Sequence, residues 1–489
     1  MTGKVLHITP HLNGGLGKVL LSTLKYFNRG ASTHEVLVYG PSNLLPEEFT
    51  PHRDSISFEP NIEGIRGRLQ PFELIQIEYW NHPLIYKLLC SGVLDKARVI
   101  GCAHIQGESP PQLITNESIR YFDKLLLTGI SSEKILQESK LDSRKLREIR
   151  FPLDLSGSRF NERSRNATSS RVVLGYVGTL SYAKLHKCFL RMCSELDRNI
   201  KLVIVGRDED GRLEQEAKND YPKLAAEFLG FRTDISDILQ TIDVFVYPLR
   251  RGHYGTGELA LVEALHSGAA TLAFNNPGEQ RLIVDGVTGL LADDEADFVS
   301  KLTRLCDDAS FRRRLGINAN RHIVERYSIE KCFEDIENCY RDVCRSLSSS
   351  SDISERSYHC LEAEWADDFQ EGFRLFLESM RDARESHRIF LDYFKARSSG
   401  EANRAERAEA AMLDFFRDNT GFEHTSKGGL GHYLHVFPGD EHLEQLHRLA
   451  LRALGRAHDV AMCSRPHPVT KLARVVQRAA FGVLSEVLL

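Results

Sequence analysis

Two series of short apolar segments set the strongest limit on how this 489-residue chain can fold. In the first series, the runs KVLHITP, EVLVYG, FELIQIEYW, ARVIGCAHIQG and KLLLTGIS alternate with helix-like segments. After a polar stretch at 161–170, the runs VVLGYVGTL, KLVIVG, DVFVYPL and AATLAFN repeat this alternation. Strands that are apolar nearly throughout are typical of parallel sheets covered by helices on both faces. We therefore predict two tandem, Rossmann-like doubly wound α/β domains, at residues 1–160 and 171–345.

A serine-rich segment, SLSSSSDISERS, ends this pattern, and a different region follows it. We predict a helical region of unassigned role at 356–489. Its apolar residues recur at helical spacing, which places them on one face: Trp365, Phe369, Phe373, Phe376 and Met380. The last segment, PVTKLARVVQRAAFGVLSEVLL, could lie as an amphipathic helix on an anionic membrane surface. A terminal helix packed on its own domain is the favoured alternative.

Composition excludes several classes of protein. The net charge of -5 gives no reason to expect binding to nucleic acid. The ten cysteines form no CxxC pair, which argues against a zinc site and against a disulfide framework. The first residues do not resemble a signal peptide, and no uncharged run is long enough to span a bilayer. We expect a cytoplasmic protein, with the inner face of the membrane as one place where it acts.

Three glycine-containing loops follow predicted strands and begin helices. NGGLGKVL contains Gly14 and Gly15, and GYVGTLSYAKLHK contains Gly178 and Lys184. Glycine lets the backbone approach a ligand, and the unpaired N–H groups at a helix start attract an anion. An ordinary tight turn and a solvated surface lysine are the alternatives.

The third loop, HYGTGE, precedes a helix that carries two carboxylates. Its backbone N–H groups, around Thr256 and Gly257, suit a diphosphate. Glu258 fits the first turn of a helix, where the helix dipole favours a negative charge. Glu263 has core-like neighbours in LALVEAL, so its carboxylate needs a partner.

These motifs together resemble the GT-B glycosyltransferases of family 4. The resemblance is specific in the second domain and is carried by GYVGTLSYAKL, KLVIVGRDEDGRL, FLGFRTDISDILQTIDVFVYPL, ELALVEALHSGAATLAFNNPGEQRLIVDGVTGLL and RYSIEKCFEDIENCYRDV. It is thinner in the first domain, through GGLGKV and the strand around His104. It implies the GT-B fold, in which Gly15 and Lys184 bind the donor diphosphate, Glu263 holds the ribose hydroxyls and His104 lies near the donor sugar.

Two departures from the family pattern bear on the donor site. Thr179 stands where the family usually has an arginine, so Arg207, Arg250 or Arg251 would have to replace that cation. Gly255 stands where the family has a glutamate, and Glu258 would then lie near the sugar or the diphosphate.

The resemblance implies a reaction. We expect transfer of a sugar from a UDP- or GDP-linked donor to an acceptor hydroxyl, with retention, without a metal and without a further cofactor. Lys184, Glu258 and His104 are the expected catalytic residues, and Gly14, Gly15, Gly178, Thr179, Thr256, Gly257 and Glu263 the expected donor-binding residues. A lipid-linked or polysaccharide acceptor suits this scheme. The alternative is an inactive GT-B-like chain that serves as a scaffold or regulator of another transferase.

Overall fold

The computed structural model describes the chain in segments, and each statement below concerns these. They are residues 3–28, 33–41, 43–105, 107, 113–127, 142–149, 154–155, 157, 159–160, 171–182, 184–196, 199–208, 211–251, 253, 259–346, 389, 392–393, 396, 401–418, 430–436 and 441–453. The chain divides into two compact units, Met1–Arg381 and Asp382–Leu489.

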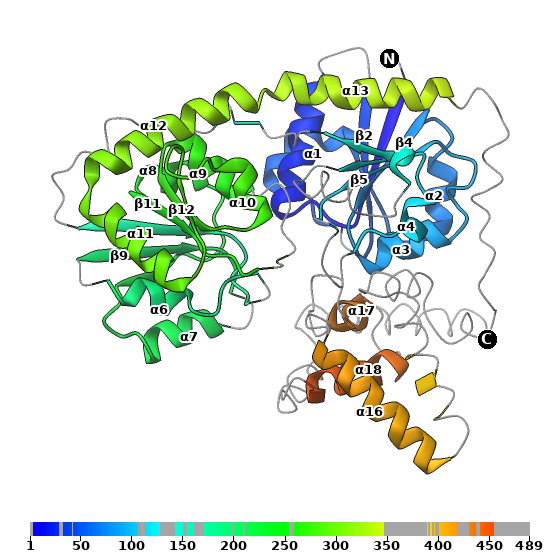
Figure 1. Cartoon of the computed structure of the whole chain (residues 1–489). Coiled ribbons are helices and arrows are strands. Elements are labelled where there is room, and N and C mark those ends of the chain that lie inside the picture. Colours follow the sequence, from blue (N-terminus) through cyan, green and yellow to red (C-terminus); the bar gives the residue numbers. More distant parts are fainter. Residues whose placement is uncertain are drawn as a thin grey trace, which may run out of the picture. The chain divides into compact units, whose positions relative to one another are not determined.

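The first part of the larger unit is built on a parallel sheet (Figure 1). Among the described residues it has seven strands in the order β3-β2-β1-β4-β5-β6-β7. The order reverses between β1 and β4, and ligands of such sheets bind at this point, beyond the carboxyl ends of the strands. The elements are β1 (Lys4–Thr9), α1 (Gly14–Phe27), β2 (Thr33–Tyr39), η1 (Glu47–Ser55), β3 (Ile56–Glu59), α2 (Ile62–Arg68), β4 (Leu74–Tyr79), α3 (Pro83–Cys90), β5 (Val99–Ala103), α4 (Asn116–Ile119), β6 (Lys124–Leu127), η2 (Ser143–Lys145) and β7 (Leu146–Glu148).

A second parallel sheet follows, with six described strands in the order β10-β9-β8-β11-β12-β13. Its order reverses between β8 and β11, so the same rule predicts a ligand site beyond these strands. The elements are β8 (Val172–Val177), α6 (Phe189–Ser194), β9 (Ile200–Val205), α7 (Arg212–Asn219), β10 (Ala226–Phe228), α8 (Ile235–Gln240), β11 (Val244–Tyr247), α9 (Leu259–Ser267), β12 (Ala270–Phe274), α10 (Pro277–Leu282), β13 (Leu290–Ala292), α11 (Glu295–Asp307), α12 (Ala309–Arg326) and α13 (Ile329–Ser346).

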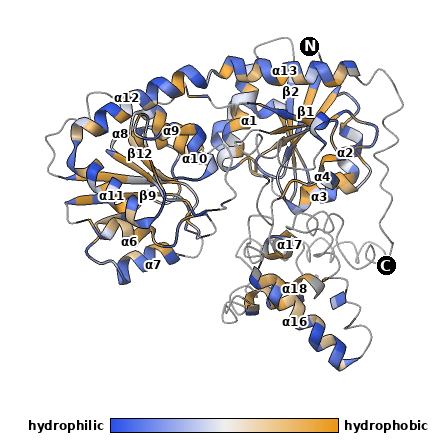
Figure 2. Ribbon diagram, in the orientation of Figure 1, coloured by the Kyte–Doolittle hydropathy of each residue, from blue (hydrophilic) through white to orange (hydrophobic). Residues whose placement is uncertain are grey.

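Hydropathy and helix caps explain these elements. The central strands are mostly hydrophobic, while the helices that cover them carry one hydrophilic face (Figure 2). Every residue of β4, β5, β11 and β12 is buried. The side chains of Asp294 and Asp308 accept hydrogen bonds from the first turns of α11 and α12, which fixes where these helices begin.

Helix α13 follows the second sheet in the chain but packs on the first. Its residues Phe333, Ile336 and Val343 share one core with Val5, Leu74 and other residues of the first sheet. The sequence predicts a second domain over residues 171–345, whereas α13 within this range packs its apolar face on the first sheet. The other domain boundaries remain predictions.

The smaller unit is helical in its described part. It contains α16 (Ala402–Asp418), α17 (Leu430–Val436) and α18 (Glu441–Ala453), and α16 packs against α18. The apolar stripe from Trp365 to Met380 and the final amphipathic segment lie outside the described residues. None of the helices in the described segments is both long and apolar enough to cross a bilayer.

Candidate active site

The start of helix α1 lies against the start of helix α9. Gly14 begins α1 with a φ of 67°, and a Cβ atom added to Gly15 would lie 3.1 Å from Cδ1 of Leu259 in α9. Lys18 also lies on α1, and its Nζ donates to Oε1 of Glu263 on α9 at 2.5 Å. The side chain of Glu263 is 15% exposed. The partner that this carboxylate needs is therefore a cation from the first domain.

Lys184 lies at the carboxyl end of strand β11. Its Nζ donates to the hydroxyl of Tyr247, the last residue of β11, at 3.1 Å. Gly178 directly follows β8 with a φ of 156°, and a Cβ atom there would lie 2.6 Å from the hydroxyl of Tyr176. That hydroxyl donates to the carbonyl of Thr179 at 3.0 Å. Glycine is thus required at 178, and the turn that it permits leads to Thr179 and Lys184.

Arg250 is a second cation beside Lys184. Its backbone N–H donates to the carbonyl of Lys184 at 2.9 Å. Nε of Arg250 is buried and has no hydrogen-bond partner among the described residues. A buried donor without an acceptor costs about 1–3 kcal/mol, and more when it is charged, so an anion at this position would be stabilising. Arg251 differs, because its Nη2 donates to the carbonyl of Asp293 at 3.2 Å.

A buried polar cluster anchors the loop that contains Arg250. Nδ2 of Asn276 donates to the carbonyl of Leu249 and to Oε1 of Glu279, both at 3.2 Å. Nε2 of His253 lies 3.3 Å from the same oxygen of Glu279. The side chains of His253 and Glu279 are almost fully buried. The sequence motifs did not point to this cluster, although NNPGEQ offered a signal, since Asn276 and Glu279 lie three residues apart at the start of α10.

A second buried polar network lies in the first domain, at the carboxyl ends of its central strands. Oε2 of Glu78 accepts from Nε2 of His104 at 2.7 Å. Oε1 accepts from Nδ1 of His7 and from Nε2 of Gln76, both at 2.8 Å. Oε1 of Gln76 accepts in turn from the hydroxyl of Tyr340, on α13, at 2.6 Å. His104 was predicted from the sequence, whereas Glu78 was not.

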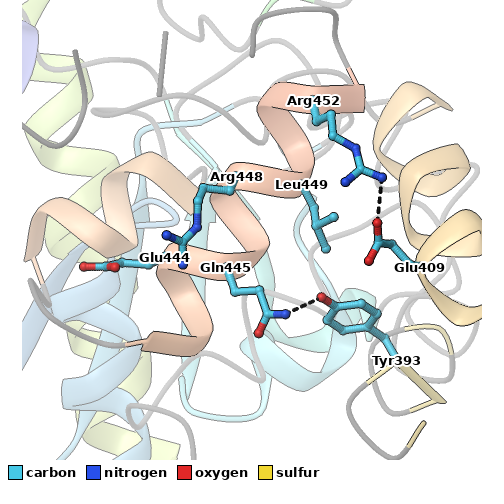
Figure 3. A pocket seen from close by; sticks show the side chains of 7 residues that line it. All are labelled: Tyr393, Glu409, Glu444, Gln445, Arg448, Leu449 and Arg452. Atoms are coloured by element: carbon cyan, nitrogen blue, oxygen red, sulfur yellow. Dashed lines mark hydrogen bonds and ion pairs between the residues drawn. The ribbon is translucent and has the colours of Figure 1, made fainter. Parts of the chain in front are cut away.

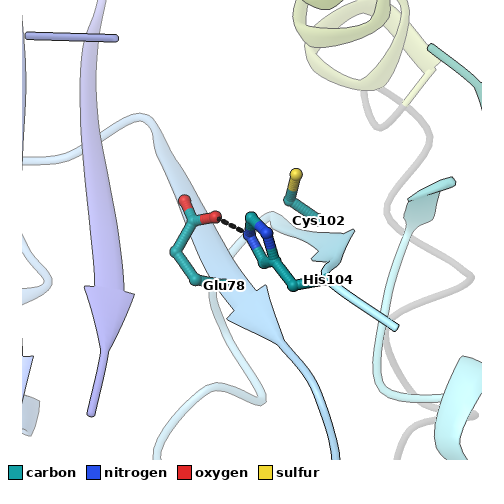
Figure 4. Close-up of side chains that lie close together, drawn as sticks. All are labelled: Glu78, Cys102 and His104. Atoms are coloured by element: carbon teal, nitrogen blue, oxygen red, sulfur yellow. Dashed lines mark hydrogen bonds and ion pairs between the residues drawn. The ribbon is translucent and has the colours of Figure 1, made fainter. Parts of the chain in front are cut away.

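Glu78 is ionised in this network. Burial opposes its ionisation, but hydrogen bonds from His104 and His7 outweigh burial and lower the pKa of Glu78 to about 2. Figure 4 shows Glu78, Cys102 and His104 together, and their donor atoms lie within 4.8 Å of one another. Burial raises the pKa of the Cys102 thiol well above its usual value, whereas metals bind the thiolate. Because three hydrogen bonds already occupy the carboxylate, these residues form a hydrogen-bonded network and do not resemble a vacant metal site.

Two other groupings in the described residues differ from this network. The ligand-type atoms of His186, Cys188 and Glu295 also lie within 4.8 Å of one another, but Glu295 pairs with Arg191.

In the helical unit, a hollow of about 490 Å³ is drawn in Figure 3. Its polar groups largely bind one another, since Arg452 pairs with Glu409 and Gln445 donates to Tyr393. The residues that line it are Tyr393, Glu409, Glu444, Gln445, Arg448, Leu449 and Arg452.

The predicted site residues thus fall into three groups. Gly14 and Gly15 begin α1, which contacts α9 through Gly15 and Leu259 and through Lys18 and Glu263. Gly178, Thr179 and Lys184 lie on the loop after β8, and His104 belongs to the network around Glu78. Thr256, Gly257 and Glu258 lie outside the described residues, as does Gly255. The roles of all these residues remain predictions.

Comparison with solved structures confirms the predicted fold class. The Anabaena protein HepE, solved in complex with UDP and glucose, superposes with a TM-score of 0.60 at 14% identity, over 70% of this chain and 100% of HepE. Residues 158–322 match the family Glycosyl transferases group 1. The chain has a GT-B fold, and its residues 158–322 are similar to the group 1 glycosyl transferases. Lys184, Arg250, Glu263 and Glu279 all lie within this range.

Curated glycosyltransferases are similar to this chain over part of their length. The capsular polysaccharide biosynthesis glycosyltransferase CapM of Staphylococcus aureus is 23% identical, over 48% of this chain and 59% of CapM. The UDP-Gal:alpha-D-GlcNAc-diphosphoundecaprenol alpha-1,3-galactosyltransferase of Escherichia coli is 32% identical, over 29% of this chain and 36% of that enzyme. The chain therefore spans about a third to three fifths of the curated relatives that it matches.

Proposed function

We propose that this chain is a glycosyltransferase that moves a sugar from a nucleotide diphosphate to an acceptor hydroxyl. The observation that carries the proposal is the buried Nε of Arg250, which has no acceptor among the described residues, in a residue whose backbone is hydrogen-bonded to that of Lys184. A buried guanidinium N–H without an acceptor is costly, and the phosphate of a nucleotide sugar supplies an acceptor of the right charge. Arg250 then replaces the arginine that the family has at the position of Thr179.

The remaining donor groups have partners that fit this scheme. Glu263 would accept hydrogen bonds from the ribose hydroxyls through Oε2, while Oε1 keeps its contact with Lys18. The N–H groups at the start of α1 would face the diphosphate. We keep Thr256, Gly257 and Glu258 as proposed residues of the loop after Arg250.

The chemical difficulty of the reaction is the charge that develops on the departing diphosphate. The Lys184 ammonium is held by the Tyr247 hydroxyl, and the Arg250 backbone is held by that of Lys184; cations positioned in this way before the reaction would stabilise that charge. We propose that these residues act without a metal, and that the anomeric configuration is retained, as the family resemblance implies. His104 would bind the donor sugar.

The donor is proposed to be UDP-linked, with GDP as the second choice. HepE is similar in fold and was solved with UDP. For the acceptor, CapM is named for capsular polysaccharide and the Escherichia coli enzyme for a diphosphoundecaprenol-linked sugar. We therefore propose a polysaccharide or a lipid-linked acceptor, met at the inner face of the membrane.

Nucleotide binding tests the proposal directly. UDP, GDP and ADP are compared by thermal shift and by calorimetry, and one of them should raise the melting temperature. Lys184→Ala and Arg250→Ala should each weaken that binding about tenfold or more, since each removes a charge-assisted contact. Arg251→Ala is the matched control for Arg250→Ala, because Arg251 already has a protein acceptor.

Turnover is tested with a panel of radiolabelled nucleotide sugars. The wild-type chain should slowly hydrolyse one donor, and Lys184→Ala should abolish this hydrolysis. If none of the three nucleotides bound, or if Arg250→Ala and Arg251→Ala had equal effects, the assignment of this site would be wrong. If no nucleotide bound, the alternative role of a scaffold for another transferase would be favoured.

A further inference from the structure

The network around Glu78 combines features that a purely structural core does not need. Glu78 and His7 are each 1% exposed, and the side chain of His104 is 9% exposed. Burying a carboxylate and two imidazoles costs more than burying apolar side chains of similar volume. The strands around this network could have been completed with such side chains, because their other ends already are: Leu74 precedes Gln76 on the same face of β4, and Val5 precedes His7 on β1.

The position of the network relative to the strands is the second observation. Side chains alternate along a strand, so Leu74, Gln76 and Glu78 share the face of β4 that α13 covers. Along this face the residues change from apolar to amide to carboxylate toward the carboxyl end. Glu78 at this end of β4 contacts His104, which lies just beyond the neighbouring strand β5. His104 is therefore on the edge where ligands of a parallel sheet bind. The polar groups therefore lead from α13 to the candidate site.

We propose that Glu78 is a positioning residue for His104, and that Gln76 and Tyr340 link the orientation of His104 to the seating of helix α13. The proposal rests on the proposed function, because His104 is the group that would meet the donor sugar. Glu78 holds Nε2 of His104 at 2.7 Å, which fixes both the protonated nitrogen and the plane of the ring. The backbone N–H of His104 also donates to the carbonyl of Tyr79 at 2.7 Å, so the main chain that carries the ring is fixed as well.

The link to α13 consists of two hydrogen bonds in series. The Tyr340 hydroxyl donates to Oε1 of Gln76, which leaves the amide N–H₂ of Gln76 to donate to Glu78. A glutamine turned the other way would present an N–H₂ group to Tyr340 and an oxygen to the Glu78 carboxylate, which is repulsive. The Glu78 carboxylate thus sets the orientation of Gln76, and the Tyr340 hydroxyl donates to the amide oxygen that this orientation presents, which strengthens the hydrogen bond from Gln76 to the carboxylate that holds His104.

The described groups that face Glu78 come from several elements. His7 comes from β1 and is in turn 2.8 Å from Nδ1 of His34, through its Nε2. Burial lowers the pKa of His34 well below its usual value, so His34 is neutral. The thiol of Cys102 is next to Glu78 and stays protonated. The described hydrogen-bond partners of Glu78 are therefore two imidazoles and one amide.

The test compares three variants of the full chain, assayed with the nucleotide sugar that the wild-type chain turns over. Glu78→Gln keeps the size of the side chain but removes its charge, and kcat should fall about tenfold, the loss expected for one charge-assisted hydrogen bond. Tyr340→Phe should lower kcat two- to fivefold. Val343→Ala removes apolar side-chain volume from the same helix but keeps α13 in place and the Tyr340 hydrogen bond intact, and it should leave kcat unchanged. The affinity for UDP should not change in any of them.

A double-mutant cycle separates positioning from general stability. In a His104→Ala background, Glu78→Gln should cause no further loss of kcat, because the residue that it positions is gone. Additive losses would overturn the proposal, as would equal effects of Tyr340→Phe and Val343→Ala.

A readout without turnover keeps this inference separate from the proposed function. The proton on Nε2 of His104, assigned by its loss in His104→Ala, should resonate far downfield because its acceptor is a carboxylate. Glu78→Gln and Tyr340→Phe should shift this signal, and Val343→Ala should not. If the wild-type chain hydrolysed no donor, the proposed function would fail while this readout still decided the link. An unshifted signal in Tyr340→Phe would refute it.

Discussion

The buried carboxylate of Glu78 should make the stability of this chain depend on pH in a defined window. Its pKa is about 2 in the folded chain, against 4.5 for an ordinary glutamate. Because the folded pKa is the lower one, the ionised form stabilises the fold above pH 4.5, and this contribution is lost as the pH falls toward 2. The difference between the two values corresponds to about 3 kcal/mol at pH 7, of which about 1 kcal/mol is lost by pH 3.5.

Urea unfolding of the wild-type chain and of Glu78→Gln, at pH 7 and at pH 3.5, measures this contribution. The variant cannot ionise at position 78, so the gap in unfolding free energy between the two proteins should narrow by about 1 kcal/mol on acidification. Val343→Ala changes no titratable group, and its gap to the wild type should be the same at both pH values. A gap for Glu78→Gln that stayed constant, or widened, in acid would refute the reasoning.

Three further predictions concern other parts of the chain. Glu263→Gln should weaken UDP binding about tenfold, as measured by calorimetry. Lys18→Ala should change the unfolding free energy by less than about 1 kcal/mol, because the ion pair of Lys18 is half exposed. A larger loss of stability in Lys18→Ala would contradict this prediction. Phe333→Ala should lower the unfolding free energy by about 3–5 kcal/mol in urea, because the ring stacks on Tyr26 at 4.3 Å in a fully buried position, and a loss below about 1 kcal/mol would show that α13 is not anchored there. Removal of residues 468–489 should reduce sedimentation with anionic liposomes if this segment is a membrane anchor, and equal sedimentation of both chains would reject the anchor.

The fold could be predicted because the apolar runs left few alternatives. Strands such as VVLGYVGTL and DVFVYPL have no polar face, so the sequence predicts a parallel sheet covered by helices on both faces. The packing of α13 on the first sheet could not be predicted in this way. An amphipathic helix shows that it has an apolar face, but its sequence does not say which of two neighbouring sheets that face covers.

The candidate site could be predicted only where a loop motif marks it. Lys184 and Glu263 lie in such motifs. Glu78 lies in FELIQIEYW, which reads as an apolar strand. The signal was present, because Gln76 and Glu78 are two residues apart and therefore share a face. Their partners come from β1, from β5 and from α13, at separations that only the folded chain brings together. Arg250 was one of three candidates, and its Nε, which has no partner in the described part of the chain, distinguishes it from Arg251.

The seating of α13 also has a consequence for biosynthesis. The first sheet is complete once Leu146–Glu148 has been made, but its core includes Val343, which leaves the ribosome much later. At typical translation rates the interval is roughly 10 to 40 seconds. Throughout that interval the nascent first domain exposes the apolar surface that α13 later covers. Chaperones would have their main opportunity to bind during this pause, and premature termination before residue 329 would release a chain prone to aggregate.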